Sequence, residues 1–409
     1  MTFRNYDPSK DKDAVHRIIR EVGWLEKGKE EVLDASIESA RAMVAEVNGE
    51  PECIVTTAPG TMRYLDEDLP LVEVTMVATS RVARRQGLAK RLVARAVAAD
   101  VAEGAIVGRV CVFDQGYYDR VGFGMGSYEH TVAFDPATLK VSVRPRVPRR
   151  LAAADVKLIH SSRLARRRGH GGANYPGPAV TQVELAYHTD DGFGLGYCDG
   201  SNGELTHHLY CSGRGERGPY HVHWLAFQTN EQFLELMALI KSLADQVRLV
   251  RIREPVGIQL QDLLDRPFKH QAVTERGRFE NSITTYAGWQ VRISDLAACL
   301  ARTHLPWGEV RFNLHLTDPV AELLDEGAAW RGVGGEYVVI LSEQSSCHPG
   351  SDPSLPTLTA SVNAFSRLWL GVRPATGLAA TDQLSGPPAL LEDLDRVLRL
   401  PDPKPDWPF

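Results

Sequence analysis

The sequence has few of the residues that cross-link a fold or hold a chain in a membrane. Its 6 cysteines are scattered through 409 residues with no Cys-x-x-Cys pair, which indicates reduced, packed thiols rather than a disulfide or zinc framework. No uncharged apolar run is long enough to span a bilayer, and the first residues carry no signal-peptide pattern. These absences predict a cytoplasmic protein without a membrane span.

An excess of positive charge is also missing. The chain has 46 lysines and arginines against 52 aspartates and glutamates, a net charge of −6. This balance argues against general nucleic-acid binding and is compatible with a cationic substrate. The basic tract Arg166–Arg168 has no interleaved aromatics and is typical of a solvated helix end. We expect no metal, because His207-His208 and His221-x-His223 are typical of strand or loop histidines.

The chain is too long for one ordinary core. Its 409 residues predict two to three domains. A Pro-rich basic stretch at Arg144–Arg150 marks one boundary, and a new amphipathic pattern begins near Trp289. We therefore expect three domains, at residues 1–143, 144–285 and 286–409.

A continuous pattern of strand, basic turn and helix organises the first segment. An apolar strand is expected at Val72–Thr79 and a helix at Lys90–Asp100, with Arg84-Arg85-Gln86-Gly87-Leu88-Ala89 between them. The first N–H groups of a helix lack intrahelical partners, and the helix dipole adds partial positive charge. The glycine allows close backbone approach, and the two arginines add charge suited to phosphate. The turn is therefore expected to hold an anion.

The rest of the first segment surrounds this motif. Asn48-Gly49 is a strong hairpin signal between two short strands. A later apolar strand leads into Tyr118-Asp119-Arg120-Val121-Gly122-Phe123, which predicts a short helical turn ending in glycine. The expected helices are Asp13–Val22 and Glu30–Ala40, and the expected strands are Ala42–Val47, Glu52–Thr57 and Ile106–Phe113.

The second segment repeats the strand, helix, strand order of the first. Its second helix has Thr229 and Gln232 spaced as a capping box. The turn from Gln228 to Glu231 has no glycine and no arginine, so we expect a duplicated domain that has lost its anion site. The expected strands are Gln182–His188, Gly194–Asp199, Glu204–Cys211, Val222–Phe227 and Val247–Ile252, with helices over Leu151–Arg168 and from Glu231 to Ala244.

The third segment mixes short strands with amphipathic helices. Leu296, Cys299 and Leu300 form one helix face, with Asp295 near the N-terminal end. Further strands are expected at Glu309–Leu316, Glu336–Leu341 and Thr357–Ala360, and further helices at Ser361–Gly371 and Pro388–Leu398.

Motifs in the first and third segments resemble known families. Arg84-x-x-Gly87-x-Ala89 is similar to the acyl-coenzyme A pyrophosphate loop of the GNAT acetyltransferases, and Tyr118–Phe123 resembles their segment with a tyrosine near the thioester sulfur. Trp289-x-x-Arg292-x-x-Asp295-Leu296 and the later Leu368–Gly371 resemble a sterol carrier protein fold. The resemblance implies an α+β protein of tandem GNAT-like mixed-sheet domains followed by a sterol carrier protein-like α/β domain.

The domain order and the aromatic C-terminal residue together resemble the Eis (enhanced intracellular survival) family. The resemblance implies a hexameric acetyl-CoA-dependent N-acetyltransferase acting on primary amines of aminoglycosides or other polyamines. It implies Tyr118 as general acid and the α-carboxylate of Phe409 as general base. The residues implied to hold the acyl donor are Val77, Ala78 and Thr79 on the strand and Arg84, Arg85, Gln86, Gly87, Leu88 and Ala89 in the turn.

These roles agree with the chemistry of amide formation, which needs a neutral amine, a polarised thioester carbonyl and a protonated leaving thiolate. A free N–H near Val77 can stabilise the oxyanion. Tyr118, with an ordinary pKa of roughly 10, can protonate a thiolate whose pKa is about 8.5. A terminal carboxylate has an ordinary pKa of about 3.5, so the Phe409 hypothesis requires burial or a relaying water.

Two alternatives stay open at this stage. The first is acetylation of a protein or peptide amine such as lysine. The second is a non-catalytic lipid or acyl-CoA binding scaffold, in which the third domain carries an apolar ligand. Spacing does not rank the acidic residues available to an amine pocket, among them Asp7, Glu21, Glu26 and Asp34.

Overall fold

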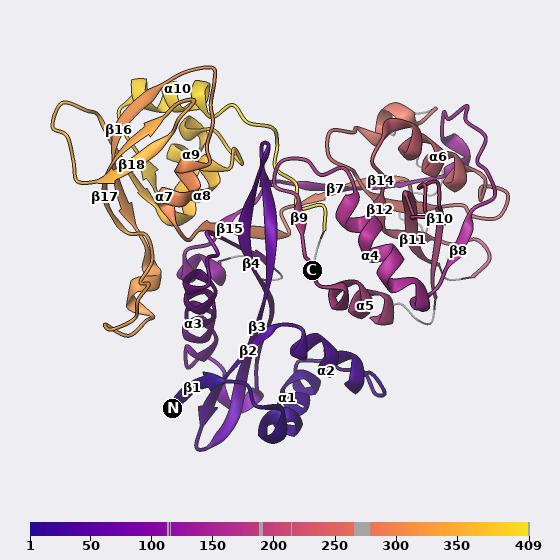
Figure 1. Cartoon of the computed structure of the whole chain (residues 1–409), viewed down its shortest axis with the longest axis horizontal. Helices are drawn as coiled ribbons and strands as arrows, with labels where there is room; N and C mark the ends of the chain where they lie inside the picture. Colours follow the sequence, from indigo (N-terminus) through magenta and orange to yellow (C-terminus); the bar gives the residue numbers. More distant parts are fainter. Residues whose placement is uncertain (113, 115, 188–190, 214, 266–278, 408–409) are drawn as a thin grey trace. The chain divides into compact units, whose positions relative to one another are not determined.

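The computed structural model describes residues 1–112, 114, 116–187, 191–213, 215–265 and 279–407 (Figure 1). The chain forms two compact units. The first unit comprises residues 1–127, 170–175 and 287–409, and the second comprises residues 128–169 and 176–286. The three-domain division at 143/144 and 285/286 stays a prediction.

The first unit contains a mixed sheet in the order β1-β2-β3-β4-β5-β15-β6, with β9 added to β3. The predicted hairpin is confirmed, because Asn48 (φ 55°) and Gly49 (φ 88°) make the left-handed turn between β2 and β3. The strands are β1 (Thr2–Asn5), β2 (Arg41–Val47), β3 (Glu50–Tyr64), β4 (Glu67–Thr79), β5 (Val107–Cys111), β6 (Gly124–Met125), β9 (Ala173–Asn174) and β15 (Trp289–Ile293).

Helices cover both faces of this sheet. Alternate side chains of β2 and β3 point to opposite faces, so Ile54 packs with α1 (Pro8–Glu21) and α2 (Glu30–Glu38) while Val55 packs with α3 (Leu88–Ala102). Figure 1 shows α3 running alongside β3 and β4. The three helices confirm the predicted amphipathic segments, and Phe113, the last residue of the predicted fifth strand, lies outside the described residues.

The same unit holds a second sheet, built from the third segment in the order β18-β17-β16-β19-β20. Asp295 caps α7 by accepting from the Ala298 N–H at 2.9 Å, as its predicted position near the helix start suggests. The strands are β16 (Val310–Thr317), β17 (Gly335–Leu341), β18 (Ser346–Pro349), β19 (Thr357–Ser361) and β20 (Leu384–Ser385), and the helices are α7 (Leu296–Ala301), α8 (Val362–Trp369), α9 (Ala375–Thr381) and α10 (Pro388–Val397).

The second unit is built on one mixed sheet in the order β14-β7-β13-β12-β11-β10-β8. Its core lies between this sheet and α6, where Phe233, Leu236 and Met237 are buried. The strands are β7 (Glu129–Phe134), β8 (Arg149–Leu151), β10 (Gly192–Tyr197), β11 (His207–Gly213), β12 (Tyr220–Ala226), β13 (Val250–Arg253) and β14 (Ser282–Tyr286), and the helices are α4 (Val156–Ala165), α5 (Pro178–Tyr187) and α6 (Asn230–Lys241).

One predicted strand in this unit is wrong. Residues 182–187 belong to helix α5, and His188 lies outside the described residues. The alternation from Val183 to Tyr187 suggested a strand, but Pro178 begins a helix and the buried positions Val180, Thr181, Val183 and Leu185 have helical spacing. The helix predicted from Leu151 begins only at Val156, because Leu151 ends strand β8.

Across the part of the chain that the structure describes, every helix is too short or too polar to serve as a membrane span.

Candidate active site

The candidate site opens where β4 and β5 separate. These parallel strands pair from Leu71/Val107 to Val74/Val110, and β4 then continues through Thr79 while β5 ends at Cys111. A bulge inserts Thr75 into β4 opposite β3, which increases the local twist. Alternate backbone N–H groups beyond Val74 therefore face the edge that β5 has left, as an acyl chain lying between the strands requires.

The predicted acyl-binding residues of β4 lie in this diverging stretch. Val77 and Thr79 are half-buried, while Ala78 is buried and packs toward α1 and α2. The Thr79 hydroxyl donates to Cys53 Sγ at 3.3 Å, so its side chain is held in the sheet and its backbone is left to contact a ligand.

The predicted anion turn follows at once. After the 3₁₀ turn η1 (Arg81–Ala83), Arg85 adopts a left-handed conformation (φ 63°) and so does Gly87 (φ 75°), the N-cap of α3. No side chain caps α3 among the described residues, so its first N–H groups stay available. Arg84 and Arg85 are exposed beside them. This donor set fits a pyrophosphate, because it combines a helix start with fixed positive charge.

The predicted tyrosine lies on the 3₁₀ turn η2 (Tyr118–Val121), which ends at left-handed Gly122 (φ 84°). The Tyr118 ring is 3% exposed and packs edge-on against Tyr117, with ring centroids 4.9 Å apart. Burial raises the pKa of Tyr118 above its ordinary 10, and the nearby Cys111 thiol adds to the rise. The hydroxyl is therefore protonated at neutral pH, as a proton donor must be.

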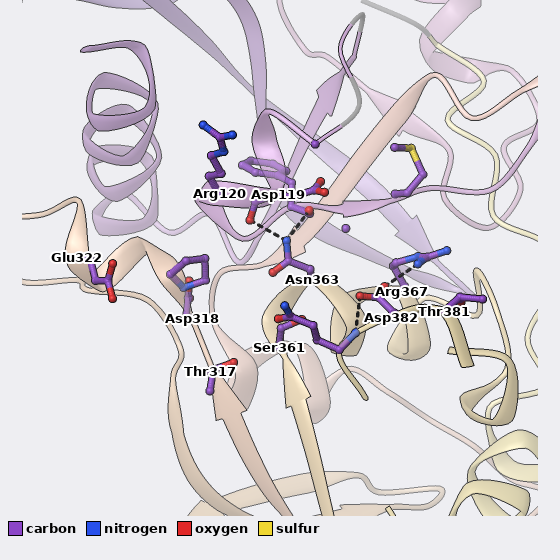
Figure 2. A pocket seen from close by; sticks show the side chains of 16 residues that line it. Asp119, Arg120, Thr317, Asp318, Glu322, Ser361, Asn363, Arg367, Thr381 and Asp382 are labelled. Atoms are coloured by element: carbon purple, nitrogen blue, oxygen red, sulfur yellow. Dashed lines mark hydrogen bonds and ion pairs between the residues drawn. The ribbon is translucent and has the colours of Figure 1, made fainter. Parts of the chain in front are cut away.

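Two residues of the third segment hold the turn η2 that contains Tyr118. Asn363 of α8 donates to the carbonyls of Asp119 (2.9 Å) and Phe123 (2.7 Å). Arg292 of β15, fully buried and paired with Asp318 at 2.7 Å, donates to the Val121 carbonyl. Figure 2 shows Asn363 in direct contact with the turn, beside a cavity of about 690 Å³ that both of them line. The position of Tyr118 therefore depends on residues about 170 to 240 positions further along the chain.

Phe409, the predicted general base, lies outside the described residues, but the chain just before it contacts the same sheet. Arg109 of β5 donates to the carbonyl oxygens of Pro405 (3.3 Å) and Trp407 (2.8 Å). It also pairs with Glu73 of β4, with Nε and Oε2 2.7 Å apart. Sequence reasoning missed this contact, although a charged residue in each of two apolar strands was a visible signal.

Three of the four acidic candidates are engaged in contacts of their own. Asp7 caps α1 through the Ser9 N–H, and Asp34 pairs with Lys12 at 2.7 Å and with His16 at 2.7 Å. Glu21 accepts from the Arg81 N–H at 2.6 Å, which places it beside the anion turn. Glu26 is exposed before α2.

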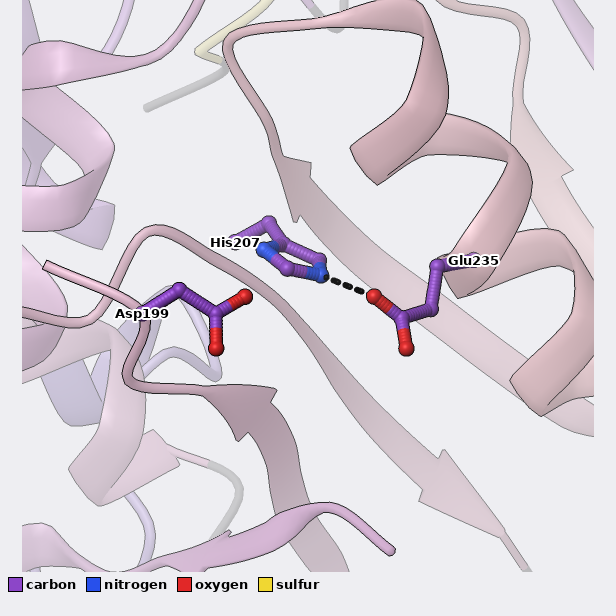
Figure 3. A group of neighbouring side chains, drawn as sticks. All are labelled: Asp199, His207 and Glu235. Carbon is purple, nitrogen blue, oxygen red and sulfur yellow. Dashed lines mark hydrogen bonds and ion pairs between the residues drawn. The ribbon is translucent and has the colours of Figure 1, made fainter. Parts of the chain in front are cut away.

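A separate cluster in the second unit has the residue types of a metal site. The ligand atoms of Asp199, His207 and Glu235 lie within 4.8 Å of one another (Figure 3). Arg146 pairs with both carboxylates, at 2.7 Å to each. Because the guanidinium engages both acids, this donor set is organised as an ion-pair network around an arginine.

Comparisons of the sequence and of the structure give different results. No protein-family model matches the sequence, and no curated protein matches it. Among solved structures, a probable N-acyltransferase from Enterococcus faecalis V583 matches with a TM-score of 0.78 at 16% identity, covering 98% of this chain and 97% of its own. A GCN5-related N-acetyltransferase from Anabaena variabilis also has a TM-score of 0.78, at 14% identity with both chains covered completely.

Eis1 from Mycobacterium abscessus likewise matches over 100% of both chains, with a TM-score of 0.78 and 16% identity. This chain has the fold of the GCN5-related N-acetyltransferases. At such low identity the likeness concerns the fold alone, and it extends over the whole chain. The GCN5-related fold agrees with the diverging strands and the uncapped helix start described above.

Proposed function

We propose that the chain is an acetyl-CoA-dependent N-acetyltransferase acting on primary amines of aminoglycosides or other polyamines. The observation that carries the proposal is the α3 start, where an uncapped helix, left-handed Gly87 and two exposed arginines follow a strand that has left its neighbour. Such a start suits the pyrophosphate of a coenzyme A donor. The likeness to a GCN5-related N-acetyltransferase favours an acetyl donor and an amine acceptor.

In the proposed reaction a neutral amine attacks the thioester carbonyl, a C–N bond forms and the C–S bond breaks. Backbone N–H groups of β4 near Val77 stabilise the oxyanion. The buried Tyr118 hydroxyl donates its proton to the leaving thiolate, and the α-carboxylate of Phe409 takes the proton from the amine, directly or through a water. Chain residues thus supply both proton transfers.

Further parts of the proposal rest on the Eis resemblance. Residues 286–409 are proposed to be sterol carrier protein-like, and the protein is proposed to be a cytoplasmic hexamer. A peptide or lysine amine is the competing acceptor, and lipid or acyl-CoA binding without catalysis is the competing function. The net charge of −6 favours a cationic acceptor.

The test is acetyl-CoA-dependent thiol release with a panel of polyamines, aminoglycosides and lysine peptides. We expect turnover with the small polyamines, and a fall in kcat of about 10²- to 10⁴-fold for Tyr118→Phe. Tyr117→Phe is the matched control, because that ring lies next to Tyr118 and is partly buried in the same cluster.

A chain extended by one residue beyond Phe409 tests the terminal carboxylate in the same assay. Collapse of turnover on extension supports Phe409 as base, whereas full turnover removes it from the mechanism. Preference for peptides would transfer the assignment to a protein acetyltransferase. Binding of acyl-CoA with no turnover of any amine would favour the scaffold.

A further inference from the structure

The last described residues of the chain, Pro403–Trp407, are held by several separate hydrogen bonds of the first unit. The Ser127 hydroxyl donates to the Pro403 carbonyl. The Lys404 N–H donates to the His170 carbonyl at 2.8 Å, and the Ala173 N–H donates to the Pro405 carbonyl at 3.2 Å. This segment, the C-terminal tail, is therefore anchored along its length. Its prolines restrict φ, which lowers the entropy lost on docking.

A further anchor of the tail is the charged residue Arg109. Its side chain is 0% exposed and contacts four partners: the Glu73 carboxylate, the Tyr175 hydroxyl and the carbonyls of Pro405 and Trp407. Trp407 is also buried, and its ring meets Tyr175 edge-on with centroids 5.4 Å apart. The guanidinium thus joins two strands, the segment 170–175 and the C-terminal tail.

The tail completes the hydrogen bonding of this buried charge. Glu73 neutralises Arg109 but takes only Nε, which leaves the terminal nitrogens to be satisfied by other acceptors. Buried N–H groups without acceptors cost free energy, so the carbonyls of Pro405 and Trp407 stabilise the buried guanidinium. In return, the guanidinium holds the tail. Removing the ion pair is therefore expected to weaken the docking of the tail, and removing the tail to weaken the ion pair.

The anchor lies at the opening of the candidate site. Glu73 and Arg109 face each other one register position before the pairing of β4 and β5 ends. Val74 and Val110, the last paired residues of the two strands, lie in the same buried cluster as Tyr118. The anchor of the tail is therefore one register position away from residues that pack with the tyrosine of the site.

We infer that Arg109 is a positioning residue, which fixes the carbonyls of Pro405 and Trp407 and so holds the C-terminal tail where the pairing of β4 and β5 ends. The anchoring stands on the contacts alone. Its effect on turnover rests on the proposed function, in which the chain terminus takes part in proton transfer.

Arg109→Lys is the test variant. Lysine keeps the positive charge opposite Glu73, so we expect the fold to be retained. Its single ammonium group cannot reach all four partners that the guanidinium contacts. Arg41→Lys is the matched control, because Arg41 pairs with Asp100 and Glu103 in the same unit and has no described contact with the tail.

Two measurements separate anchoring from catalysis. Hydrogen exchange of the C-terminal peptide reports the tail without any assay, and we expect it to speed up at least about tenfold in Arg109→Lys. With acetyl-CoA and a responsive amine, we expect kcat to fall about tenfold or more while KM for acetyl-CoA changes less than about twofold. Arg41→Lys is expected to change neither.

If hydrogen exchange of the C-terminal peptide is unchanged in Arg109→Lys, Arg109 does not anchor the tail. If the exchange is faster but kcat is unchanged, Arg109 anchors the tail but has no positioning role in turnover. A second variant, Glu73→Leu with Arg109→Met, replaces the ion pair by apolar side chains and removes the donors together. This variant should show both the faster hydrogen exchange and the lower kcat. Slow hydrogen exchange of its C-terminal peptide, as in the wild type, would contradict the inference. A wild-type chain without turnover would defeat the proposed function, while exchange still decides the anchoring.

Discussion

The two halves of the predicted repeat share a strand, helix, strand order and differ at one helix start. In the first, β4 runs past its pairing with β5 and leads to α3; in the second, β12 pairs with β13 only as far as Val222/Ile252 and leads to α6. The strands diverge in both. The first helix begins at left-handed Gly87 without a side-chain cap, whereas the second begins at Thr229 with a capping box.

The capping box changes what the helix start can bind. The Thr229 hydroxyl accepts from the Gln232 N–H, and the Gln232 side chain accepts from the N–H groups of Gln228 and Thr229. Arg167 adds further contacts, since its N–H donates to the Phe227 carbonyl and its guanidinium to Asn230. The chain therefore satisfies its own donors at α6, and those at α3 are left for an anion.

The halves differ again at the turn after the next strand. In the first half η2 contains the buried Tyr118, and in the second the 3₁₀ turn Leu260–Leu263 buries Leu260 instead. Leucine has no proton to donate. The second half keeps the strand divergence but has neither an uncapped helix start nor a tyrosine in this turn. The helix cap and one tyrosine therefore distinguish the two halves.

Among changes that test the difference between the two helix starts, we expect the largest effect from substitutions in the turn before α3. Replacing both Arg84 and Arg85 by alanine removes two exposed cations beside the open N–H groups. We expect KM for acetyl-CoA to rise about 10- to 100-fold with kcat changed little, because charge-assisted contacts contribute about 1.5–3 kcal/mol. Steady-state kinetics measure this, with Arg311→Ala as an exposed control on another sheet. A KM within twofold of wild type would contradict the assigned turn.

Acidification is expected to destabilise both units through one buried histidine in each. In the first unit His170 Nδ1 accepts from the Leu65 N–H and Nε2 donates to the Leu370 carbonyl, so the ring is neutral. Burial lowers the pKa of His170 to about 4. In the second, Trp224 donates to His208 Nε2, and burial lowers the pKa of His208 to about 3.

The direction of the stability change on acidification follows from proton uptake. With an ordinary pKa near 6.5, the unfolded chain binds more protons than the folded chain below that pH, so stability falls as pH falls toward each folded-state pKa. Each histidine is expected to cost about 2 kcal/mol between pH 7 and pH 5. Urea unfolding at the two pH values measures the loss, and His170→Asn should reduce the first unit's share. An unchanged pH dependence in that variant would contradict the assignment.

The smallest expected effect comes from the second helix start. Thr229→Ala removes the cap of α6, and we expect the free energy of unfolding to fall by about 1 kcal/mol. Kinetics with acetyl-CoA should stay as in the wild type. Thermal unfolding and the thiol-release assay check the two parts, and a marked rise in KM for acetyl-CoA would show that the second turn also serves the donor.

The elements predicted correctly carried their own local signals. Asn48-Gly49 marked a hairpin, Thr229 and Gln232 marked a cap, and the glycine of the basic turn marked the start of α3. The strand expected at residues 182–188 had only a short alternation, which a helix beginning at Pro178 also satisfies.

The parts of the site that sequence reasoning missed depend on distant partners. Glu73 and Arg109 are adjacent only because β4 and β5 pair in parallel register. Tyr175 and Trp407 reach Arg109 across 66 and 298 positions of sequence. No local periodicity encodes such contacts, so an isolated charge in an apolar strand was the only available signal.

The binding stoichiometry of coenzyme A tests the central claim most directly. Isothermal titration of the intact wild-type chain should give one site per chain, because α3 offers open donors and α6 does not. Two equivalent sites per chain, or no binding at all, would contradict the account.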